Sequence, residues 1–414
     1  MMRRTVLHCD CNNFYAAVEG VFDPSLKGKP VIVCGDPQLR HGIVLAKSYA
    51  AKACGVVTGE AIWQAKKKCP TLILIAADLR RYLGFSRKMR GISRRYTSQV
   101  EPFGLDENWL DVTGHALSGE EIAAQLRKAA KEELGITISV GVSFNKIFSK
   151  LGSEIRKPDA TTVITHENFR EKIWPLPAED LLFVGRATKR RLNELGLYNI
   201  GDIANSPLAL LRDALGKNGE SIWHNARGED QEPVLQMDEA DDVKSVGNST
   251  TPPHDIASQE EAKAIIYLLS DSVAARLRAH HLNCRTISVW MRDTELNNFE
   301  RQCRLALNSD IADEIAKAAL DLFDQSYRWH LPLRSLGVKS SDLKDSQQNV
   351  QLPLWSDPRR VKTQRFERAL DDIRQRYGHT CVQRGLLLCD RALTGINPVD
   401  DHALQPLAAM HGRG

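Results

Sequence analysis

The sequence predicts an α+β protein built from several domains. Short strand-like runs alternate with helical stretches over the first ~165 residues, a helical pattern with glycine turns covers Glu179 to Gly228, and a second mixed region starts near Lys244. The 414 residues exceed a single domain of roughly 100–200 residues. With 42% hydrophobic and 26% charged residues, the composition is that of a globular protein and excludes fibrous or disordered classes.

The first region should form a sheet with helices on one face. Ser118 and Glu121 form a capping box that begins one of these helices, and Gly135 ends it. Strands are expected at Thr5–Cys9, Pro30–Cys34, Gln99–Phe103, Trp109–Val112 and Thr137–Val142.

In the last region, Ser258 and Glu261 form a second capping box. Ile287, Val289 and Met291 alternate with polar neighbours and indicate a half-buried strand. The expected elements are a strand at Arg285–Arg292 and helices at Asp310–Asp324 and Arg359–Tyr377, followed by a loose tail.

Net charge and cysteine content give information on binding partners and on the cellular compartment. The net charge of +4 is too small to indicate a polyanionic partner by itself. The nine cysteines are scattered without CxxC pairs, which fits neither a disulfide framework nor a zinc site and suggests a reducing compartment. No signal peptide or membrane-spanning stretch is recognisable, so we expect a cytoplasmic protein that does not enter a membrane.

Three carboxylates fall at predicted strand ends. Asp10 follows the first strand, while Asp106 and Glu107 lie between two later strands. If the sheet brings these segments together, mutual repulsion calls for a divalent cation such as Mg²⁺, and two such ions support phosphoryl transfer. By themselves these residues leave open a solvated turn at Leu105–Glu107. Likewise, Phe14 and Tyr15 either pack a helix on the sheet or border the site.

Several motifs in order resemble the Y-family of translesion DNA polymerases, of the bacterial polymerase IV type. The motifs are DCNNFYAAVE from Asp10, LAKSYAAKACGV from Leu45, GLDENWLDVT from Gly104, SVGVSFNKIFSKLGSEIRKP from Ser139 and VGRATKRRL from Val184. The resemblance implies a right-hand polymerase with a ferredoxin-like palm, small fingers, a helix-hairpin-helix thumb and an α/β little finger. The implied ranges are palm 1–12 and 76–165, fingers 13–75, thumb 166–232, linker 233–244, little finger 245–345, and a clamp-binding motif, helix and tail at 346–414.

The resemblance also implies roles in catalysis. Asp10, Asp106 and Glu107 would hold two Mg²⁺ ions, replaceable by Mn²⁺, with Cys11 lending its backbone carbonyl. Tyr15 would be the steric gate against the ribonucleotide 2′-hydroxyl. Nucleotide-binding residues would be Phe14, Tyr15, Tyr49, Lys52 and Lys157.

Three positions depart from the commoner family pattern. Asn12 stands where relatives often have an aspartate, and we do not count it as a metal ligand. Lys52 replaces a commoner arginine, which keeps the charge but loses the bidentate fork. Ala46 replaces a commoner threonine and removes one hydroxyl from the expected phosphate contacts.

The resemblance further implies contacts to primer-template DNA. In the thumb, backbone amides near Gly185 and the side chains of Lys189 and Arg190 would bind phosphate, although a glycine turn with solvated charges explains the same residues. In the little finger, the expected contacts are Arg276, Arg278, Arg285 and Arg292. Such binding would be salt-dependent and independent of sequence.

A peptide near the end of the chain, NVQLPLW from Asn349, resembles the motif by which bacterial polymerases bind the sliding clamp. Gln351 would enter a polar pocket, while Leu352, Leu354 and Trp355 would fill an apolar groove. Alternatively, Leu354 and Trp355 pack against the helix that follows.

Together these features predict a monomeric, template-directed, low-fidelity DNA polymerase that adds dNTPs to a primer 3′-hydroxyl. One alternative is a nucleotidyl cyclase, which would need neither a helix-hairpin-helix nor a clamp peptide. Another is a DNA-binding accessory that has lost activity. The sequence does not reveal which lesions are bypassed.

Overall fold

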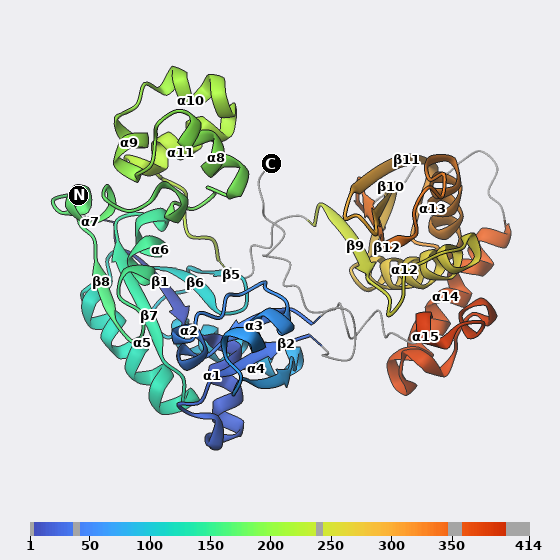
Figure 1. Cartoon of the computed structure of the whole chain (residues 1–414), viewed down its shortest axis with the longest axis horizontal. Coiled ribbons are helices and arrows are strands. Elements are labelled where there is room, and N and C mark those ends of the chain that lie inside the picture. The colour runs from blue at the N-terminus through green and yellow to red at the C-terminus, as the bar shows by residue number, and fades with distance from the viewer. Residues whose placement is uncertain (1–3, 36–41, 237–242, 347–357, 395–414) are drawn as a thin grey trace. The chain divides into compact units, whose positions relative to one another are not determined.

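The computed structural model of the chain describes residues 4–35, 42–236, 243–346 and 358–394 (Figure 1). Its contacts divide these residues into two compact units. The first contains residues 4–35 and 43–236, and the second contains residues 243–346 and 358–394. Each unit is described separately.

The centre of the first unit is a five-stranded sheet in the order β5-β6-β1-β7-β8. All neighbouring pairs are antiparallel except β7 and β8. Four of these strands overlap the ranges expected from the sequence, whereas β8 was not expected. Their bounds are β1 Val6–Cys11, β5 Val100–Phe103, β6 Glu107–Asp111, β7 Ile138–Ser143 and β8 Thr161–Val163.

Helices cover both faces of this sheet, so the expectation of helices on one face was wrong. Alternate residues of β1 point to a core formed with α1 (Phe14–Phe22), α4 (Leu79–Ser93) and α5 (Gly119–Leu134). On the other face, α6 (Lys146–Ile155) lies so close to Gly141 that a Cβ there would be 1.8 Å from the Ser149 carbonyl oxygen. A glycine in β7 therefore permits the second helical layer.

Local signals place the ends of α5 as predicted. The Ser118 side chain accepts a hydrogen bond from the Glu121 amide at 3.2 Å, and Glu121 accepts one from the Ser118 amide at 2.8 Å. Gly135 ends the helix with a left-handed φ of 70°.

The segment expected to form the fingers contains a small sheet in the order β3-β2-β4, between α1 and α4 in the chain. Only β2 was expected from the sequence. The elements are η1 Pro24–Leu26, β2 Val31–Cys34, β3 Val44–Lys47, α2 Tyr49–Ala53, α3 Ile62–Lys68 and β4 Ile73–Ala76.

After β8 the first unit is helical, as predicted. These elements are α7 Phe169–Ile173, η2 Ala178–Asp180, α8 Arg186–Glu194, α9 Ile200–Asn205, α10 Leu208–Leu215 and α11 Lys217–Ala226. Part of the expected linker is docked on the unit rather than free, because Val234 is buried against Val6 and Trp109. The Leu235 amide also donates to Glu101 Oε2 at 2.9 Å.

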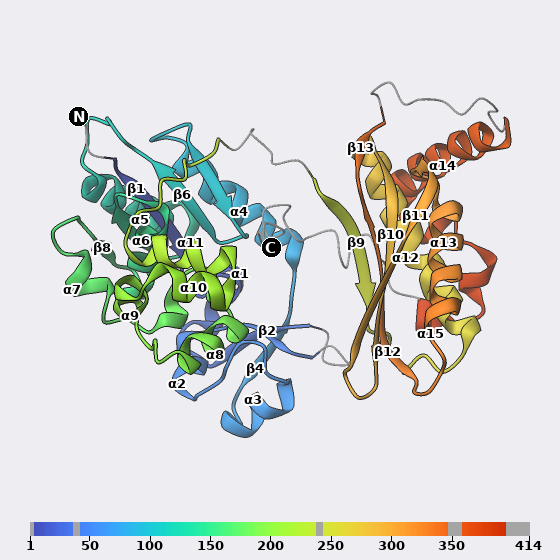
Figure 2. The same ribbon diagram turned by 90° about the horizontal axis from the view of Figure 1, so that it is seen from above.

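The second unit is a sheet in the order β11-β10-β12-β9, with α12 and α13 on one face (Figure 2). Ile287, Val289 and Met291 of β10 are buried against these helices, as their alternation predicted. The Ser258 cap is present, but Glu261 accepts from the Ala257 amide. The bounds are β9 Ser245–Thr250, α12 Gln259–Ala279, β10 Leu282–Asp293, β11 Asn298–Ser309, α13 Ala312–Ser326, β12 Leu333–Ser341 and β13 Lys344–Asp345.

The segment after the expected clamp peptide folds onto this unit. It forms α14 Pro358–Tyr377, η3 His379–Cys381, η4 Gly385–Leu388 and α15 Arg391–Thr394. Gln351, Leu352, Leu354 and Trp355 lie outside the described residues. Among the described helices, none has the length and apolar character needed to cross a membrane.

Candidate active site

Strand pairing brings the predicted carboxylates to one end of the first sheet. Asp10 pairs directly with Glu107, and the Cys11 amide donates to the Asp106 carbonyl at 3.0 Å. The carboxylate oxygens that lie within 4.8 Å of one another belong to Asp10, Glu107 and Glu154. Asp106 lines the same pocket, but its carboxylate is not in that group. Glu154, on α6, was not identified from the sequence, although it stands three residues before the predicted Lys157.

Two lysines pair with this acidic cluster. Lys157 Nζ lies 2.8 Å from Asp10 Oδ2 and 2.8 Å from Glu154 Oε1. Lys150 Nζ lies 2.6 Å from Glu107 Oε2. The ammonium groups therefore offset part of the charge of three carboxylates that converge at a site where Asp10 is buried, Glu107 half-buried and Glu154 exposed.

The environment shifts the carboxylates in different directions. Burial, together with the charges of Glu107 and Glu154, raises the pKa of Asp10 to about 9 against the opposing effect of Lys157. Burial and Glu107 raise the pKa of Asp106 to about 6. Burial alone would raise the Glu107 pKa, but His8 and Lys150 hold it below its ordinary value. The raised pKa values of Asp10 and Asp106 mean that their charged forms lack sufficient positive charge nearby, and binding of an additional cation would supply it.

His8 supports the site from behind. Its buried ring lies in β1 on the same face as Asp10, with Nδ1 2.8 Å from Ser153 Oγ and Nε2 3.5 Å from Glu107 Oε2. Burial lowers the His8 pKa, which favours the neutral ring. The two-residue spacing from Asp10 was the available signal for this residue, because alternate strand residues share a face.

Asn12 has a structural function next to the site. Its amide nitrogen donates to Ser139 Oγ at 2.9 Å, and its oxygen accepts from Thr137 Oγ1 at 3.1 Å and from the Asp159 amide at 2.8 Å. These bonds tie the end of β1 to the loop that carries Lys157. The side chain is thus occupied by protein partners, consistent with leaving Asn12 out of the ligand set.

Aromatic side chains form one wall. Tyr15 and Phe14 both line the pocket, and Phe14 is also buried in the core beneath it. The Tyr15 ring stacks on Tyr82 of α4. Burial, with a smaller contribution from Asp106, raises the pKa of Tyr15.

The pocket has a volume of about 410 Å³ and joins the carboxylates to the fingers. Tyr49 and Lys52 of α2 line it from the fingers, whereas Lys157 lines it within the acidic group, between Asp10 and Glu154. Lys47, which the sequence reasoning missed, also lines it and donates to Thr58 Oγ1 at 2.9 Å. Burial and the neighbouring Lys52 lower the pKa of Lys47. One end of this pocket is acidic and the other basic, which suits a metal-bound polyphosphate.

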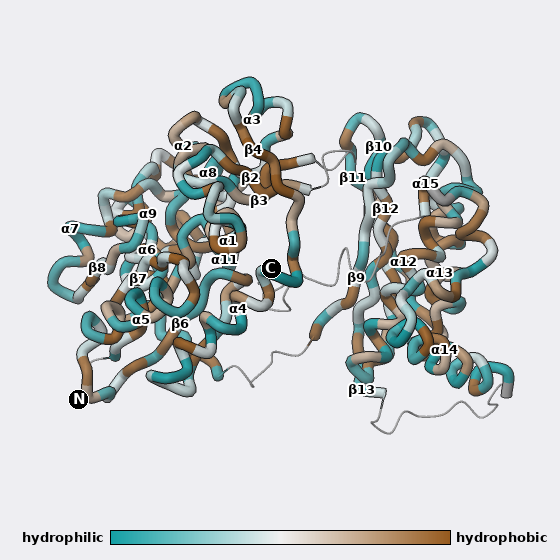
Figure 3. Tube along the Cα trace, turned by 90° about the horizontal axis from the view of Figure 1, so that it is seen from below, coloured by the Kyte–Doolittle hydropathy of each residue, from teal (hydrophilic) through white to brown (hydrophobic). Residues whose placement is uncertain are grey.

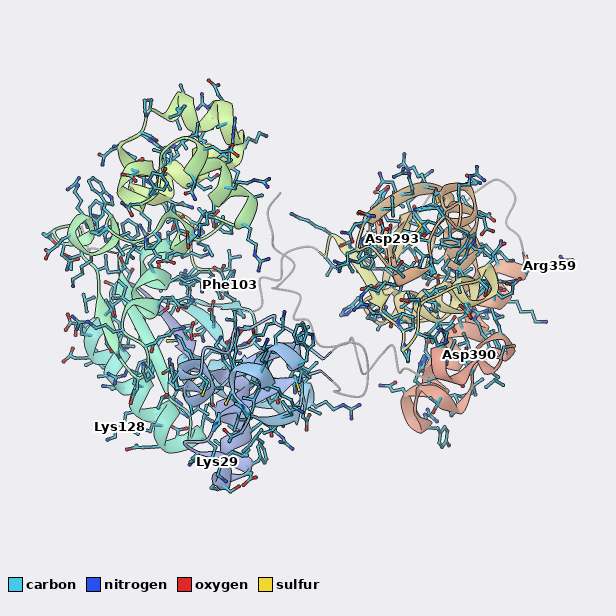
Figure 4. All side chains as sticks on the ribbon, in the orientation of Figure 1. Lys29, Phe103, Lys128, Asp293, Arg359 and Asp390 are labelled. Carbon is cyan, nitrogen blue, oxygen red and sulfur yellow. The ribbon has the colours of Figure 1, made fainter. Side chains whose placement is uncertain are left out.

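The donor set fits Mg²⁺. Asp10, Asp106 and Glu107 present hard carboxylate oxygens at a pocket large enough for a hydrated ion and a ligand. Burial raises the pKa of the Cys11 thiol well above its usual range, so a thiolate ligand is disfavoured and only the carbonyl is suited to a hard cation. Phe103 ends the edge strand β5 (Figure 4). The centroid of its ring lies 4.9 Å from that of the Trp109 ring on the neighbouring strand β6.

The predicted thumb residues lie at the start of α8. Gly185 is its exposed N-cap, and its carbonyl accepts from the Lys189 amide at 2.8 Å. The Lys189 ammonium lies 2.7 Å from Glu179 Oε2, whereas the side chain of Arg190 is exposed. A phosphate near Gly185 would therefore compete with Glu179 for Lys189.

The little-finger arginines have different surroundings. Arg278 is only 7% exposed, and its guanidinium binds Glu367 at 2.5 Å and Asp371 at 2.6 Å. Arg276 donates to the Gly247 carbonyl at 2.6 Å, and Arg285 donates weakly to the Leu305 carbonyl at 3.4 Å. Arg292 is half-buried in β10. Because the Arg278 guanidinium binds two carboxylates of α14, we do not include Arg278 among the proposed DNA contacts.

Family models match most of the chain. The impB/mucB/samB family matches residues 9–154, and its C-terminal domain matches residues 243–354. Between them, residues 179–230 match a thumb domain described as that of DNA polymerase-iota. The matched ranges include Asp10, Asp106 and Glu107.

Curated relatives and a solved structure agree with these matches. DNA polymerase IV of Acetivibrio thermocellus is 47% identical over 95% of this chain and 100% of its own length. DNA polymerase IV of Pelotomaculum thermopropionicum is 36% identical over 94% of this chain and 96% of its own length. A Y-family DNA polymerase chimera superposes with a TM-score of 0.71 and 26% identity, covering 82% of this chain and 98% of that one. The chain therefore belongs to the Y-family of DNA polymerases, among relatives named DNA polymerase IV.

Proposed function

We propose that the pocket at the ends of β1 and β6 is the polymerisation centre of this translesion DNA polymerase. The observation that carries the assignment is the register pair Asp10 and Glu107, with Asp106 adjacent, in one pocket with Tyr15 and Lys157. The primer 3′-oxygen would form a bond to the α-phosphorus of a dNTP as the bond to pyrophosphate breaks. The chain is thus a DNA-directed DNA polymerase of the low-fidelity class.

Asp10, Asp106 and Glu107, with the Cys11 carbonyl, would hold two Mg²⁺ ions. When bound, Mg²⁺ (or Mn²⁺) lowers the pKa of the primer hydroxyl and neutralises charge on the phosphates. Asp10 and Glu107 must then exchange their present contacts with Lys157 and Lys150 for contacts with cations. Lys157 would become free to move to the triphosphate.

The remaining pocket residues would orient the nucleotide. Tyr49, Lys52, Lys157 and Lys47 supply a phenol and three ammonium groups for the triphosphate. Tyr15 would occupy the space of a 2′-hydroxyl and so favour deoxyribonucleotides. Ala46 offers no hydroxyl for an additional phosphate contact.

We infer that primer-template DNA is held through its backbone. Gly185, Lys189 and Arg190 in the thumb, and Arg276, Arg285 and Arg292 in the second unit, are the candidates. Exposed Arg190 is the strongest of them, because no ion pair holds its guanidinium within the part of the chain that the structure describes. This binding would weaken steeply with salt and show no sequence preference.

Primer extension tests the proposed centre. We expect the wild-type chain to extend a primer on undamaged and lesion-bearing templates with Mg²⁺, and Asp106→Ala to lose at least about a thousandfold in rate. Asp111→Asn, at the far end of β6 from Asp106 and outside the pocket lining, is the matched control and should retain activity. No extension by the wild type on any template would reject the assignment, and formation of cyclic nucleotide from ATP would favour a cyclase.

We also propose that QLPLW binds the sliding clamp, with Gln351, Leu352, Leu354 and Trp355 as the contacts. The folding of α14 onto the second unit supports presentation of the peptide between two anchored ends. Replacement of Gln351, Leu354 and Trp355 by alanine should abolish clamp binding in a pull-down with the purified clamp. Clamp-independent primer extension should remain. Unchanged clamp binding would reject the assignment.

A further inference from the structure

The fingers expose a large aromatic side chain on their outer surface. Trp63, the second residue of α3, is 68% exposed. A Trp indole is usually largely buried, so its exposure marks a candidate contact site. The strands of the fingers form a continuous hydrophobic stretch beside α3 (Figure 3), yet Trp63 does not contribute to the buried cluster they form.

The segment that precedes Trp63 is paired with the strand that borders the polymerase pocket. Leu45 is 37% exposed and lines the pocket, and Ile43 is 44% exposed on the same face of its strand, because the intervening Val44 points into the core. Ile43 pairs with Ala61, two residues before Trp63. The start of α3 therefore follows directly on a segment that is bonded to the strand carrying the pocket residue Leu45.

Two exposed cations accompany the indole. Lys66 and Lys67 follow Trp63 by three and four residues, which places them on the same face of α3. Ala65 points to the core instead. Lys68 belongs to a different contact, since its ammonium lies 2.5 Å from Glu60 Oε2.

We propose that Trp63, Lys66 and Lys67 form a binding site for the unpaired template strand ahead of the templating base. An indole offers a stacking surface to any base, and ammonium groups at helical spacing match successive phosphates. A protein partner would also bury Trp63, but the lysines around it and the pairing of its preceding segment with the strand that borders the pocket favour a polyanion with flat apolar groups. The inference rests on the proposed polymerase function, because that function supplies a single strand at this pocket.

The test measures affinity for primer-template DNA whose template overhang is one or six nucleotides long. We expect the affinity of the wild type to increase about tenfold with the longer overhang, which is the gain expected from stacking of one base on an aromatic ring. Trp63→Ala should reduce this gain to less than about twofold, and Trp63→Phe should restore most of it. An overhang of six abasic nucleotides should give the wild type the same small gain as Trp63→Ala.

Two controls separate stacking from other effects. Tyr198→Ala removes an aromatic that is 60% exposed elsewhere in the unit, and it should leave the gain intact. The double change Lys66→Ala and Lys67→Ala should reduce the slope of log affinity against log salt for the six-nucleotide complex by about 1.4.

An unchanged gain in affinity in Trp63→Ala, or a full gain with the abasic overhang, would overturn the inference. If the wild type extends primers yet shows no gain, only this inference fails; if it does not extend them at all, the proposed function fails instead.

Discussion

The ring of Tyr15 lies flat on the ring of Tyr82, with centroids 4.2 Å apart and planes inclined by 10°. Tyr82 is itself fixed, since its hydroxyl donates to Glu19 Oε1 at 2.7 Å, and Glu19 also binds Arg81 at 2.6 Å. A tyrosine of α4 therefore packs against the residue of α1 that we propose as the steric gate. The selectivity of the gate should depend on both rings.

Removing the gate should admit ribonucleotides. In Tyr15→Ala the volume of the ring becomes available to a 2′-hydroxyl, so the preference for dNTP over rNTP should fall by about tenfold or more. Tyr15→Phe keeps the ring and should keep the preference. Single-nucleotide incorporation kinetics with dCTP and CTP opposite guanine measures the ratio of kcat/KM. Equal ribonucleotide use by the wild type and Tyr15→Ala would reject the gate.

Changing the supporting ring should separate stability from selectivity. Tyr82→Phe keeps the stack but leaves a buried Glu19 oxygen without its donor, so the free energy of unfolding should fall by about 1–3 kcal/mol with little change in sugar discrimination. Tyr82→Leu removes the flat support and should relax discrimination as well. Urea unfolding and the incorporation assay give the two readouts. Normal discrimination in Tyr82→Leu would show that Tyr15 is held without the stack.

Replacing Asn12 should disturb the nucleotide site without changing its affinity for metal. Asn12→Ala loses the bonds to Ser139, Thr137 and the Asp159 amide, so stability should fall by about 1–3 kcal/mol and the dNTP KM should rise because the Lys157 loop is loosened. The Mg²⁺ concentration for half-maximal extension should stay within about twofold. Asp10→Asn is the comparison and should raise that concentration. A comparable rise in Asn12→Ala would identify Asn12 as a ligand.

Two arginines should differ in what their removal costs. Arg278→Ala leaves the buried Glu367 and the half-buried Asp371 without their cation, so the second unit should lose about 3–5 kcal/mol of stability. Arg190→Ala, on an exposed helix surface, should leave stability within about 0.5 kcal/mol but reduce the slope of log affinity for DNA against log salt by about 0.9. Thermal unfolding and salt-titrated DNA binding distinguish the two. A reduced salt slope in stably folded Arg278→Ala would return that residue to the DNA interface.

Features that depend on near neighbours in the chain were predictable from the sequence. The Ser118 and Glu121 capping box, the Gly135 terminus and the alternation of Ile287, Val289 and Met291 all act over a few residues. Asp10 was identifiable because it ends a strand. Asp106 and Glu107 were candidates because they lie between two predicted strands, and the motifs that resemble the Y-family added the expectation that all three carboxylates hold two metal ions.

Which charged side chains contact one another depends on the tertiary fold. The register of β1 and β6 pairs Asp10 with Glu107. The packing of α6 on Gly141, on the sheet face opposite to α1, α4 and α5, adds Glu154, Lys150 and Ser153 to the site. The same dependence on packing explains why Arg278, which looks like a DNA contact in the sequence, is buried against α14. The sequence gives the charge of each side chain. Its partner depends on strand register and helix packing between residues far apart in the chain, which local sequence patterns do not predict.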